Sequence, residues 1–483
     1  MELKQLTSGF YANADDLPEI EITGLNTRAD SVTPGEVFIA IKGTQADGHD
    51  YIPTAIKRGA AAIISNGRDM GQLSVPQIKV NNPRLAASRI AAEFYSFPSK
   101  ELTIVGITGT NGKTTVASLV KAIFDAAGLQ SAQMGTLGII ANGYPVEKTL
   151  TTLDPIQLQK TLRQLRADGF THVVMEVSSH ALDQYRVADV DFNAAVFTNL
   201  TPEHLDYHKS MEAYFASKVR LFKQLPITAT AIINTDGEFG ERILSECTTP
   251  TIITSVEGDA DVHYSDLNTS LGGIRGQIQA GEQLIDISSS LAGYFNVENI
   301  LSSVAAALSV GIPLSAIELG ISCCKQIPGR MEVFELPSGG KVIIDYAHTP
   351  DAYEKVLSTI AEMKPPKGRL TVLFGCGGDR DAAKRPVMAG IAEHYSDRCY
   401  ITPDNPRFED PEKITAEIIS GFTGNNYHVF QDRGLALEKA LQECRGRDIL
   451  VVLGKGREDY QDIQGKKIPY SEYDLIRRYC HAD

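Results

Sequence analysis

A glycine-rich run with a lysine and several threonines is the part of the sequence best suited to chemistry on phosphate. Residues 106–115 read Gly-Ile-Thr-Gly-Thr-Asn-Gly-Lys-Thr-Thr. Glycines allow backbone N–H groups to turn toward phosphate oxygens, and a helix that begins at the lysine adds the positive end of its dipole. Lys113 can reach the β- and γ-phosphates of a nucleotide, and the Thr114 hydroxyl can bind Mg²⁺. The run predicts a nucleotide-binding loop; the alternative is a glycine-rich turn that contains Gly-Lys-Thr by chance.

The nucleotide is expected to be ATP. A GTP-binding loop of this class is accompanied by an Asn-Lys-x-Asp motif, which the sequence lacks; Asn234-Thr235-Asp236 comes nearest, without the lysine. The spacing also departs from the general Gly-x4-Gly-Lys-Thr pattern, because Ile107 stands where that pattern has its first glycine. The loop is therefore a variant of the common pattern.

Acids and histidines follow at two further places. Glu176 lies in a β-type run at 172–177, and the stretch 198–208 contains two histidines, His204 among them. The carboxyl ends of strands in open α/β sheets are where ligands bind. Taken alone, Glu176 is as readily a surface or capping acid, and His204 a structural histidine. Beside a phosphate loop they indicate a Mg²⁺ site, because phosphate charge needs hard cations and these need oxygen ligands. Lys218, taken alone, reads as a solvated helix lysine.

These residues can meet only if strands and helices alternate around them, and the sequence supplies that alternation. The β-type run at 102–108, the loop and a helical run at 113–127 form the strand–loop–helix context that a phosphate loop requires. Similar alternation on both sides indicates mostly parallel sheets. The other expected strands are 36–41, 60–65, 77–80, 172–177, 194–198, 229–234, 341–346, 369–374, 398–402, 427–430 and 448–453, and the other expected helices include 83–97, 411–421 and 433–444.

Two breaks divide the chain into three expected domains of the α/β class. Pro98-Ser99-Lys100 interrupts the pattern before the loop, and Ile327-Pro328-Gly329 marks a second boundary. A chain of 483 residues is too long for a single hydrophobic core. We expect a small N-terminal α/β substrate domain at 1–98, a central ATP-binding domain with a mostly parallel sheet at 99–328, and a C-terminal Rossmann-like domain at 329–483.

Composition and charge argue against several classes of protein. A net charge of −14 and a pI near 5.3 argue against a nucleic-acid binder. The longest apolar runs fall far short of the roughly 20 residues that cross a bilayer, and Met1-Glu2-Leu3-Lys4 does not open a signal sequence. The seven cysteines contain no Cys-x-x-Cys pair and read as reduced thiols. We expect a cytoplasmic monomer without a nucleic-acid partner or a membrane span.

Several blocks resemble the Mur ligase family, a relative of the folylpolyglutamate synthetases. Residues 109–115 match the family's ATP loop, and 175–186 are close to a family substrate block. Residues 294–299 and 329–332 resemble elements on the ATP side, and 345–350 match a motif between domains. The resemblance covers most of the chain and is strongest to members that add diaminopimelate to the peptide stem of a bacterial cell-wall precursor. It implies that ATP is bound by Gly109, Thr110, Asn111, Gly112, Lys113, Thr114, Thr115, Asn299, Arg330 and Asp345.

The resemblance also implies a catalytic set and a metal set. The catalytic residues would be Lys113, Glu176, His204 and Lys218, and Mg²⁺ would be held by Thr114, Glu176, His204 and Lys218. In the family, the lysine that matches Lys218 is carbamylated, which turns an ammonium into a carboxylate. A lysine with a lowered pKa is nucleophilic enough to take up CO₂.

The second substrate implied by the resemblance is a UDP-MurNAc-dipeptide. Residues 150–154 resemble a family block but depart from it at Leu150 and Leu153, and the family's Asp-Ser-Arg falls on Arg28-Ala29-Asp30, so the uridine contact would be absent or supplied by Thr27 or Ser31. The N-terminal domain is therefore expected to bind the UDP-sugar. The implied contacts are Thr27, Ser31, Thr44, Gln45, Ala46, Thr151, Thr152, Ser178, Gln184 and Arg186.

The third substrate is expected in the C-terminal domain. Asp404-Asn405-Pro406-Arg407 matches the motif of diaminopimelate-adding members, and lysine-adding relatives usually lack its arginine. An arginine fork can hold the second carboxylate of meso-diaminopimelate with two hydrogen bonds. On its own the motif is also a good turn sequence. The implied contacts are Arg380, Asp404, Asn405, Pro406, Arg407, Gly454 and Glu458; Arg457 stands where members often have His.

The reaction implied by the resemblance has two stages. ATP phosphorylates the D-glutamate side-chain carboxylate of UDP-MurNAc-L-Ala-D-Glu, and the diaminopimelate amine then displaces phosphate. No residue in the sequence stands out as the base for that amine. Two alternatives stay open: a lysine-adding or folylpolyglutamate-type ligase, and a nucleotide-dependent switch protein that turns over ATP without forming an amide.

Overall fold

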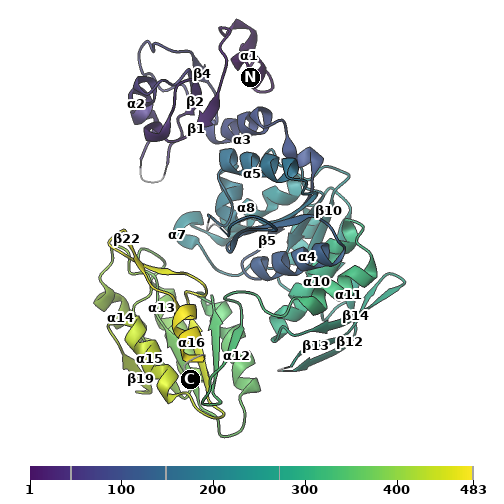
Figure 1. Ribbon diagram of the computed structural model, residues 1–483, viewed down its shortest axis with the longest axis vertical. Coiled ribbons are helices and arrows are strands. Elements are labelled where there is room, and N and C mark those ends of the chain that lie inside the picture. Colours follow the sequence, from purple (N-terminus) through teal and green to yellow (C-terminus); the bar gives the residue numbers. More distant parts are fainter. Residues whose placement is uncertain (44–45, 147–148, 271, 481–483) are drawn as a thin grey trace.

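The computed structural model describes residues 1–43, 46–146, 149–270 and 272–480 and arranges them around three sheets and one hairpin (Figure 1). Thr44 and Gln45, both expected at the dipeptide site, lie outside the described residues. Within the described ranges, no helix is long and apolar enough to cross a membrane.

The N-terminal sheet has four parallel strands in sequence order and is topmost in Figure 1. Its core places Val37, Ile39 and Ile64 against Ile90 of the last helix. That helix begins at Pro83, after Asn82 accepts hydrogen bonds from two backbone N–H groups of the first turn. The elements are β1 (Gly24–Asn26), β2 (Glu36–Ile39), β3 (Ala62–Ser65), β4 (Gln77–Lys79), α1 (Leu3–Thr7), α2 (Ile52–Lys57) and α3 (Pro83–Phe94).

The central sheet has ten strands in the order β14-β13-β12-β11-β10-β9-β5-β8-β6-β7. β5 lies between β9 and β8 and is parallel to both. β7 is antiparallel to β6, and β12, β13 and β14 are antiparallel to one another, although β12 joins β11 in parallel. The strands are β5 (Thr103–Thr108), β6 (Ser131–Gly135), β7 (Gly138–Ala141), β8 (His172–Glu176), β9 (Ala194–Phe197), β10 (Thr230–Asn234), β11 (Thr251–Thr254), β12 (Val262–Ser270), β13 (Gly273–Ala280) and β14 (Gln283–Ser289).

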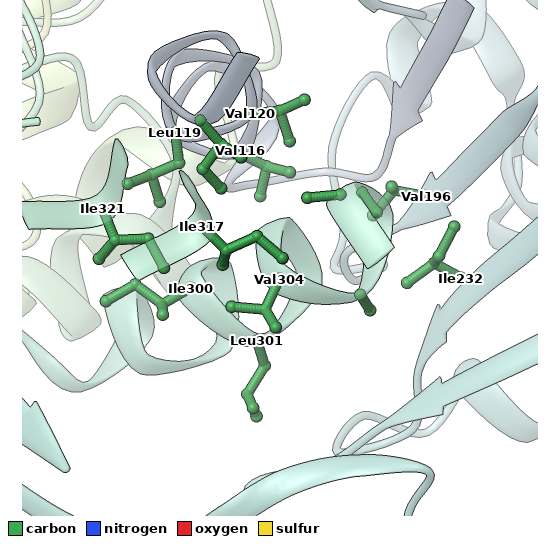
Figure 2. Packing of buried hydrophobic residues seen from close by; sticks show 14 of the residues in the cluster. Val116, Leu119, Val120, Val196, Ile232, Ile300, Leu301, Val304, Ile317 and Ile321 are labelled. Atoms are coloured by element: carbon green, nitrogen blue, oxygen red, sulfur yellow. The ribbon is translucent and has the colours of Figure 1, made fainter. Parts of the chain in front are cut away.

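Helices cover both faces of the central sheet, because side chains of a strand point alternately to its two sides. Val105 and Ile107 of β5 join one core, and Ile104 joins the other. Figure 2 shows the first core, in which side chains of α4, α10 and α11 meet beside Val196 and Ile232 of the sheet. The helices are α4 (Lys113–Ala126), α5 (Pro155–Ala167), α6 (Ser179–Asp183), α7 (Leu205–His208), α8 (Met211–Lys223), α9 (Gly240–Ser245), α10 (Tyr294–Ser309) and α11 (Leu314–Cys323).

The C-terminal sheet has six strands in the order β15-β16-β20-β17-β18-β19, parallel except for β15. Alternate residues of β20 enter two separate cores on its two faces. The elements are β15 (Glu332–Glu335), β16 (Lys341–Asp345), β17 (Leu370–Phe374), β18 (Arg398–Ile401), β19 (Tyr427–Val429), β20 (Ile449–Leu453), the hairpin β21 (Tyr460–Ile463) and β22 (Lys466–Pro469), α12 (Pro350–Met363), α13 (Lys384–Tyr395), α14 (Pro411–Ile419), α15 (Arg433–Glu443) and α16 (Glu472–Cys480).

The predicted α/β class with mostly parallel sheets is confirmed, and each predicted strand is present within one or two residues at either end. The helix predicted at 83–97 ends at Phe94, because Ser96 and Phe97 have φ of 61° and 48°, which a helix cannot contain. The antiparallel β12–β14 meander was not predicted. The three sheets fall inside the ranges 1–98, 99–328 and 329–483, which we keep as proposed domain boundaries.

Candidate active site

The glycine-rich loop lies at the carboxyl end of β5, where other parts of the chain approach its backbone closely. Gly109 has φ +149°, and a Cβ there would lie 1.9 Å from Thr198 Oγ1. Gly112 has φ +87°, and a Cβ there would lie 2.3 Å from Asn299 Oδ1. A side chain at either position would displace the loop, so the two glycines are required by its shape.

Lys113 folds back over this loop. Its Nζ donates to the carbonyl oxygens of Gly109 at 2.9 Å and Thr110 at 2.7 Å. Burial lowers the pKa of Lys113, and the nearby carboxylates of Glu203 and Glu176 act in the opposite direction. The ammonium thus lies on the loop whose N–H groups would face a phosphate.

Glu176, at the end of β8, is buried beside the first turn of α4. Its Oε2 accepts hydrogen bonds from Thr114 Oγ1 and from Thr136 Oγ1, both at 3.1 Å, and its Oε1 accepts from the Thr136 N–H at 2.8 Å. A Cβ on Gly135 would lie 2.2 Å from Oε1, so glycine gives the carboxylate its place. The two oxygen groups predicted to bind Mg²⁺, Thr114 and Glu176, are therefore neighbours.

Lys218 is 1% exposed, unlike the solvated helix lysine that its local sequence resembles. From α8 its Nζ donates to the Gly109 carbonyl oxygen at 2.8 Å and lies 4.7 Å from the centre of the Tyr214 ring. Burial and, after it, the charge of Lys113 lower the pKa of Lys218 well below its ordinary value. This is the environment that carbamylation requires; the modification itself stays a prediction.

Glu203 and His348 form a contact that the sequence did not reveal as part of the site. His348 Nε2 lies 2.9 Å from Glu203 Oε1, and His204 Nε2 lies 3.6 Å from Glu203 Oε2. Burial acts to raise the pKa of Glu203, but the hydrogen bond and charge of His348, with the charges of His204 and Lys113, lower it overall. Burial lowers the pKa of His204 to about 4. A hydrogen bond thus links the central and C-terminal sheets at the site.

Arg330 provides a second link between the two sheets. It precedes β15, and its Nη2 donates to Thr114 Oγ1 at 3.0 Å. Its guanidinium carbon lies 4.7 Å from the centre of the Tyr346 ring, a cation–π arrangement. The predicted ATP contact therefore lies directly at the phosphate loop.

Asp345 and Asn299 are also at this junction, with different surroundings. Asp345, at the end of β16, accepts hydrogen bonds from the N–H groups of Met331 and Ala347, both at 2.7 Å. Burial raises its pKa, while the charge of Arg330 acts against that rise. Asn299 of α10 donates to Asn296 Oδ1 at 3.0 Å and approaches Gly112. Asp345 thus also holds the backbone beside Arg330.

One cavity of about 240 Å³ joins these side chains. Its lining contains every predicted ATP-binding residue. It also contains Glu176, His204 and Lys218, which are predicted both to act in catalysis and to bind the metal, and Thr151 and Ser178 of the predicted dipeptide set. Those lining residues are Gly109, Thr110, Asn111, Gly112, Lys113, Thr114, Thr115, Thr151, Glu176, Ser178, His204, Lys218, Asn299, Arg330 and Asp345.

Thr152, Gln184 and Arg186 of the predicted dipeptide set adjoin this cavity through a hydrogen-bonded network. Thr152 Oγ1 donates to the Glu176 carbonyl oxygen at 2.9 Å and accepts from the Ser178 N–H at 3.0 Å. Arg186 donates to the Thr152 carbonyl oxygen at 2.8 Å and to Gln184 Oε1 at 2.9 Å. The network fixes the end of β8 and the start of α6 relative to one another.

The described residues of the N-terminal domain that are predicted to bind the dipeptide do not line this cavity. Thr27 and Ala46 lie on loops of the four-stranded domain, and Ser31 ends the short 3-10 helix Ala29–Ser31. In the described part of the chain no hydrogen bond or ion pair joins them to the central sheet. Arg84 of α3, which the sequence did not single out, spans part of this gap. Arg84 donates a hydrogen bond to the Lys42 carbonyl oxygen at 2.8 Å. The pKa of Arg186 is lowered, first by burial, against which the charge of Asp154 acts, and also by the charge of Arg84.

The predicted amino-acid contacts gather at the carboxyl ends of β18 and β20. Asp404 and Asn405 are nearly buried, and Asn405 Nδ2 donates to Glu458 Oε2 at 2.8 Å. Gly454 has φ +107°, and a Cβ there would lie 2.6 Å from Asp404 Oδ2. The Asp404 carboxylate therefore approaches a glycine that leaves room beside it, and Asn405 holds Glu458 in place nearby.

The two predicted arginines lie on neighbouring loops. Arg407 has φ +52°, and its Nη1 donates to the Gly378 carbonyl oxygen. Pro406 packs on the same glycine, where a Cβ would lie 1.9 Å from the Pro406 carbonyl oxygen. Arg380 is exposed. The pKa of His180 is lowered first by burial and also by the charge of Arg380, which puts Arg380 near the central sheet.

The site's oxygen groups suit a Mg²⁺ ion that is shared with nucleotide phosphates. Among the residues described, no cluster of three or more His, Cys, Asp and Glu side chains is placed to hold a metal alone. Mg²⁺ in nucleotide sites is usually bound through one or two carboxylates together with phosphates. The Thr114–Glu176 pair meets that requirement; Lys218 could join it only as a carbamate.

Comparisons with known proteins agree over most of the chain. Three family models match: "Mur ligase family, catalytic domain" at 21–95, "Mur ligase middle domain" at 107–307 and "Mur ligase, glutamate ligase domain" at 329–456. The chain is 41% identical over 448 residues to the UDP-N-acetylmuramoyl-L-alanyl-D-glutamate–2,6-diaminopimelate ligase of Chromobacterium violaceum, covering 92% of this chain and 91% of that protein. The protein of that name from Geobacter sulfurreducens is 40% identical over 476 residues, covering 94% and 93%.

Solved structures give the same result for the fold. A structure of a UDP-N-acetylmuramoyl-L-alanyl-D-glutamate–2,6-diaminopimelate ligase matches with a TM-score of 0.67 at 32% identity, covering 95% of each chain. MurF from Acinetobacter baumannii matches with a TM-score of 0.67 at 18% identity, covering 99% of this chain and 98% of that one, which is a likeness of fold.

Proposed function

The chain belongs to the Mur ligase family, and we infer that it is an ATP-dependent ligase that adds meso-diaminopimelate to UDP-MurNAc-L-Ala-D-Glu in peptidoglycan precursor synthesis. Its substrates are small molecules: ATP, the UDP-MurNAc-dipeptide and the amino acid. ATP is used together with Mg²⁺, as in the family. The proposal names this activity above the lysine-adding and folylpolyglutamate-type alternatives because relatives of about 40% identity over nearly the full length carry it.

The observation that carries the proposal is the contact between the phosphate loop and the part of the chain that forms the C-terminal sheet. The phosphate loop follows β5, and the predicted amino-acid contacts follow β17, β18 and β20 of another sheet. Hydrogen bonds from Arg330 to Thr114 and from Asn111 to Asp351 join the two sides. A reaction between a phosphorylated carboxylate and an amine held by a separate domain needs this arrangement.

In the first stage, Lys113 and the N–H groups of the loop bind the phosphates and oppose the charge that develops during phosphoryl transfer. Arg330 adds a second cation beside Thr114. When bound, Mg²⁺ would be held by Thr114 and Glu176, with His204 and a carbamylated Lys218 as further proposed ligands, and would neutralise phosphate charge. Thr151, Thr152, Ser178, Gln184 and Arg186 orient the D-glutamyl carboxylate toward the loop.

In the second stage, the amine of diaminopimelate attacks the acyl phosphate, an amide bond forms and phosphate leaves. Arg380 and Arg407 are proposed to grip the distal carboxylate, and Glu458 with the Gly454 carbonyl oxygen the distal ammonium. Holding the amino acid at its far end places the reacting amine at the cavity, which is an effect of orientation.

A purified-protein assay tests the function. The protein is supplied with ATP, Mg²⁺ and the UDP-MurNAc-dipeptide, and with diaminopimelate, lysine or glutamate in separate reactions; ADP and the mass of the product are measured. We expect a tripeptide product with diaminopimelate and much less with the others. ATP turnover without any amide product would favour the switch-protein alternative, and a lysine or glutamate product would replace the assigned amino acid.

A further inference from the structure

Lys455, next to the predicted amino-acid contacts, has a fully buried side chain (0% exposed). Its Nζ donates to Asn405 Oδ1 and to Glu458 Oε2, both at 2.9 Å. Burying an ammonium is costly unless it is paired and hydrogen-bonded, as it is here. Neither the sequence motifs nor the proposed function gives this lysine a role.

The two acceptors of Lys455 are also joined to each other. Asn405 Nδ2 donates to the same Glu458 Oε2 at 2.8 Å, and Asn405 Oδ1 accepts a second hydrogen bond from the Asp462 N–H at 2.9 Å. The amide of Asn405 can therefore lie only one way round, and Glu458 Oε2 is fully engaged. Glu458 Oε1 is left to face a ligand, since Glu458 is a quarter exposed.

The charges around Lys455 leave an excess of one negative charge. Asp404 Oδ1 lies 3.7 Å from Lys455 Nζ, and the Asp404 side chain is only 10% exposed. Two carboxylates, Asp404 and Glu458, thus share one ammonium. Without Lys455 the same space would hold two negative charges close together, and it would attract a cation more strongly than a group that carries both charges.

We propose that Lys455 is a positioning and specificity-determining residue of the amino-acid subsite. It aims Asn405 and Glu458 at the distal amine and limits the negative charge there. The distal end of diaminopimelate has both an ammonium and a carboxylate, whereas that of lysine has an ammonium alone. A subsite with less negative charge favours the first over the second. This inference rests on the proposed function, because it assumes that diaminopimelate occupies the subsite.

The test compares Lys455→Met with the same change at Lys439, an exposed lysine of α15 in the same domain. For each full-length variant, kcat and KM are measured with diaminopimelate and with lysine. Hydroxylamine replaces the amino acid in a parallel assay. It attacks the acyl phosphate to give a hydroxamate and phosphate without using the subsite, so it reports the ATP-dependent stage alone.

For Lys455→Met we expect the KM for diaminopimelate to rise about 10- to 100-fold, the range for a lost hydrogen bond to a charged group. The ratio of kcat/KM for diaminopimelate to that for lysine should fall, and hydroxamate formation should stay at the wild-type rate. Lys439→Met should match wild type in all three. Lys455→Arg retains the positive charge, so its ratio of kcat/KM for diaminopimelate to that for lysine should lie between those of Lys455→Met and wild type.

Other outcomes overturn the inference or the function separately. An equal fall in kcat/KM with both amino acids would mean that Lys455 has a structural role alone. If neither the ratio of kcat/KM values nor the KM for diaminopimelate changed, Lys455 would have no role in the subsite. If Lys455→Met loses hydroxamate formation, the fold is disturbed, and Lys455→Gln, which keeps one hydrogen bond, is judged by the same ratio. If wild type forms hydroxamate but no diaminopimelate product, the proposed function fails instead.

Discussion

Arg330 Nη2 donates a hydrogen bond to Thr114 Oγ1 across 3.0 Å, although 216 residues separate them in the chain. Thr114 belongs to the helix that follows the phosphate loop, and Arg330 to the segment that enters the C-terminal sheet. Because Thr114 also donates to Glu176, one hydroxyl group lies between a cation and a carboxylate from different parts of the fold. A bound nucleotide and its Mg²⁺ would have to change these partners.

Replacing Lys113 with alanine should abolish the first chemical stage. Removing a cation that acts on the transferring phosphoryl group costs about 3–4 kcal/mol of transition-state stabilisation. Both ADP release and hydroxamate formation should fall by about 10²- to 10³-fold. Lys121→Ala, farther along the same helix, is the control and should keep the wild-type rate. A folded Lys113→Ala protein with a near-normal rate would contradict the ATP-loop assignment.

Lys218→Ala should also be inactive, for a different reason. If Lys218 is carbamylated, its loss removes a carboxylate, and a small carboxylate such as acetate should restore part of the rate by filling the space. Lys223→Ala, an exposed lysine of the same helix, should keep full activity. The modification is checked directly by the mass of the intact wild-type protein under CO₂. An active enzyme with an unmodified Lys218 would refute the prediction.

Arg407→Ala should change the choice of amino acid. The substitution leaves the distal carboxylate of diaminopimelate without its partner, so kcat/KM for diaminopimelate relative to lysine should fall by about 10²-fold or more. The KM values for ATP and for the UDP-MurNAc-dipeptide should hardly move. Since Arg407 also donates to the Gly378 carbonyl oxygen, equal losses with both amino acids would instead assign it to loop support.

The Glu203–His348 pair should make stability depend on pH in the acid range. The pKa of Glu203 is lowered in the folded protein, so the ionised Glu203 carboxylate contributes stability above the usual glutamate pKa, and that contribution is lost as the pH falls through the lowered value. Glu203→Gln should lower the melting temperature at pH 7, with a cost of roughly 1.5–3 kcal/mol for a hydrogen bond to a charged group. The difference in melting temperature between Glu203→Gln and wild type should become smaller as the pH is lowered below about 4. A difference that does not change with pH would argue against a stabilising contact between Glu203 and His348.

The sequence predicted those features of the fold that depend on residues close to one another in the chain. The strand, loop and helix around Lys113, the parallel sheets and the order of the motifs all follow from local pattern. It did not predict the partners of Glu203 and Lys218, because His348 lies 145 residues from Glu203 and Gly109 lies 109 residues from Lys218. The helix that carries Lys218 has an ordinary amphipathic pattern. Its lysine is buried where the helix meets the phosphate loop.

Arg84 and the β12–β14 meander were missed for similar reasons. Nothing in the residues around Arg84 distinguishes it from a surface arginine of α3; its contact with the Lys42 carbonyl oxygen is set by the packing of a loop. In the meander only β14 alternates exposed and buried residues, and most of β12 is exposed or half-buried. Its polar composition gives little local sign of membership in the central sheet.

The C-terminal sheet builds its buried cores from residues 331–476, and the central sheet builds its own from residues 102–327. Loops at the edge of one can therefore change without disturbing the packing of the other. In evolutionary terms, the nucleophile of such a ligase can be exchanged while its energy source is inherited intact. Engineering a new amino-acid substrate should accordingly begin with the loops after β17, β18 and β20 and leave the residues around β5 unchanged.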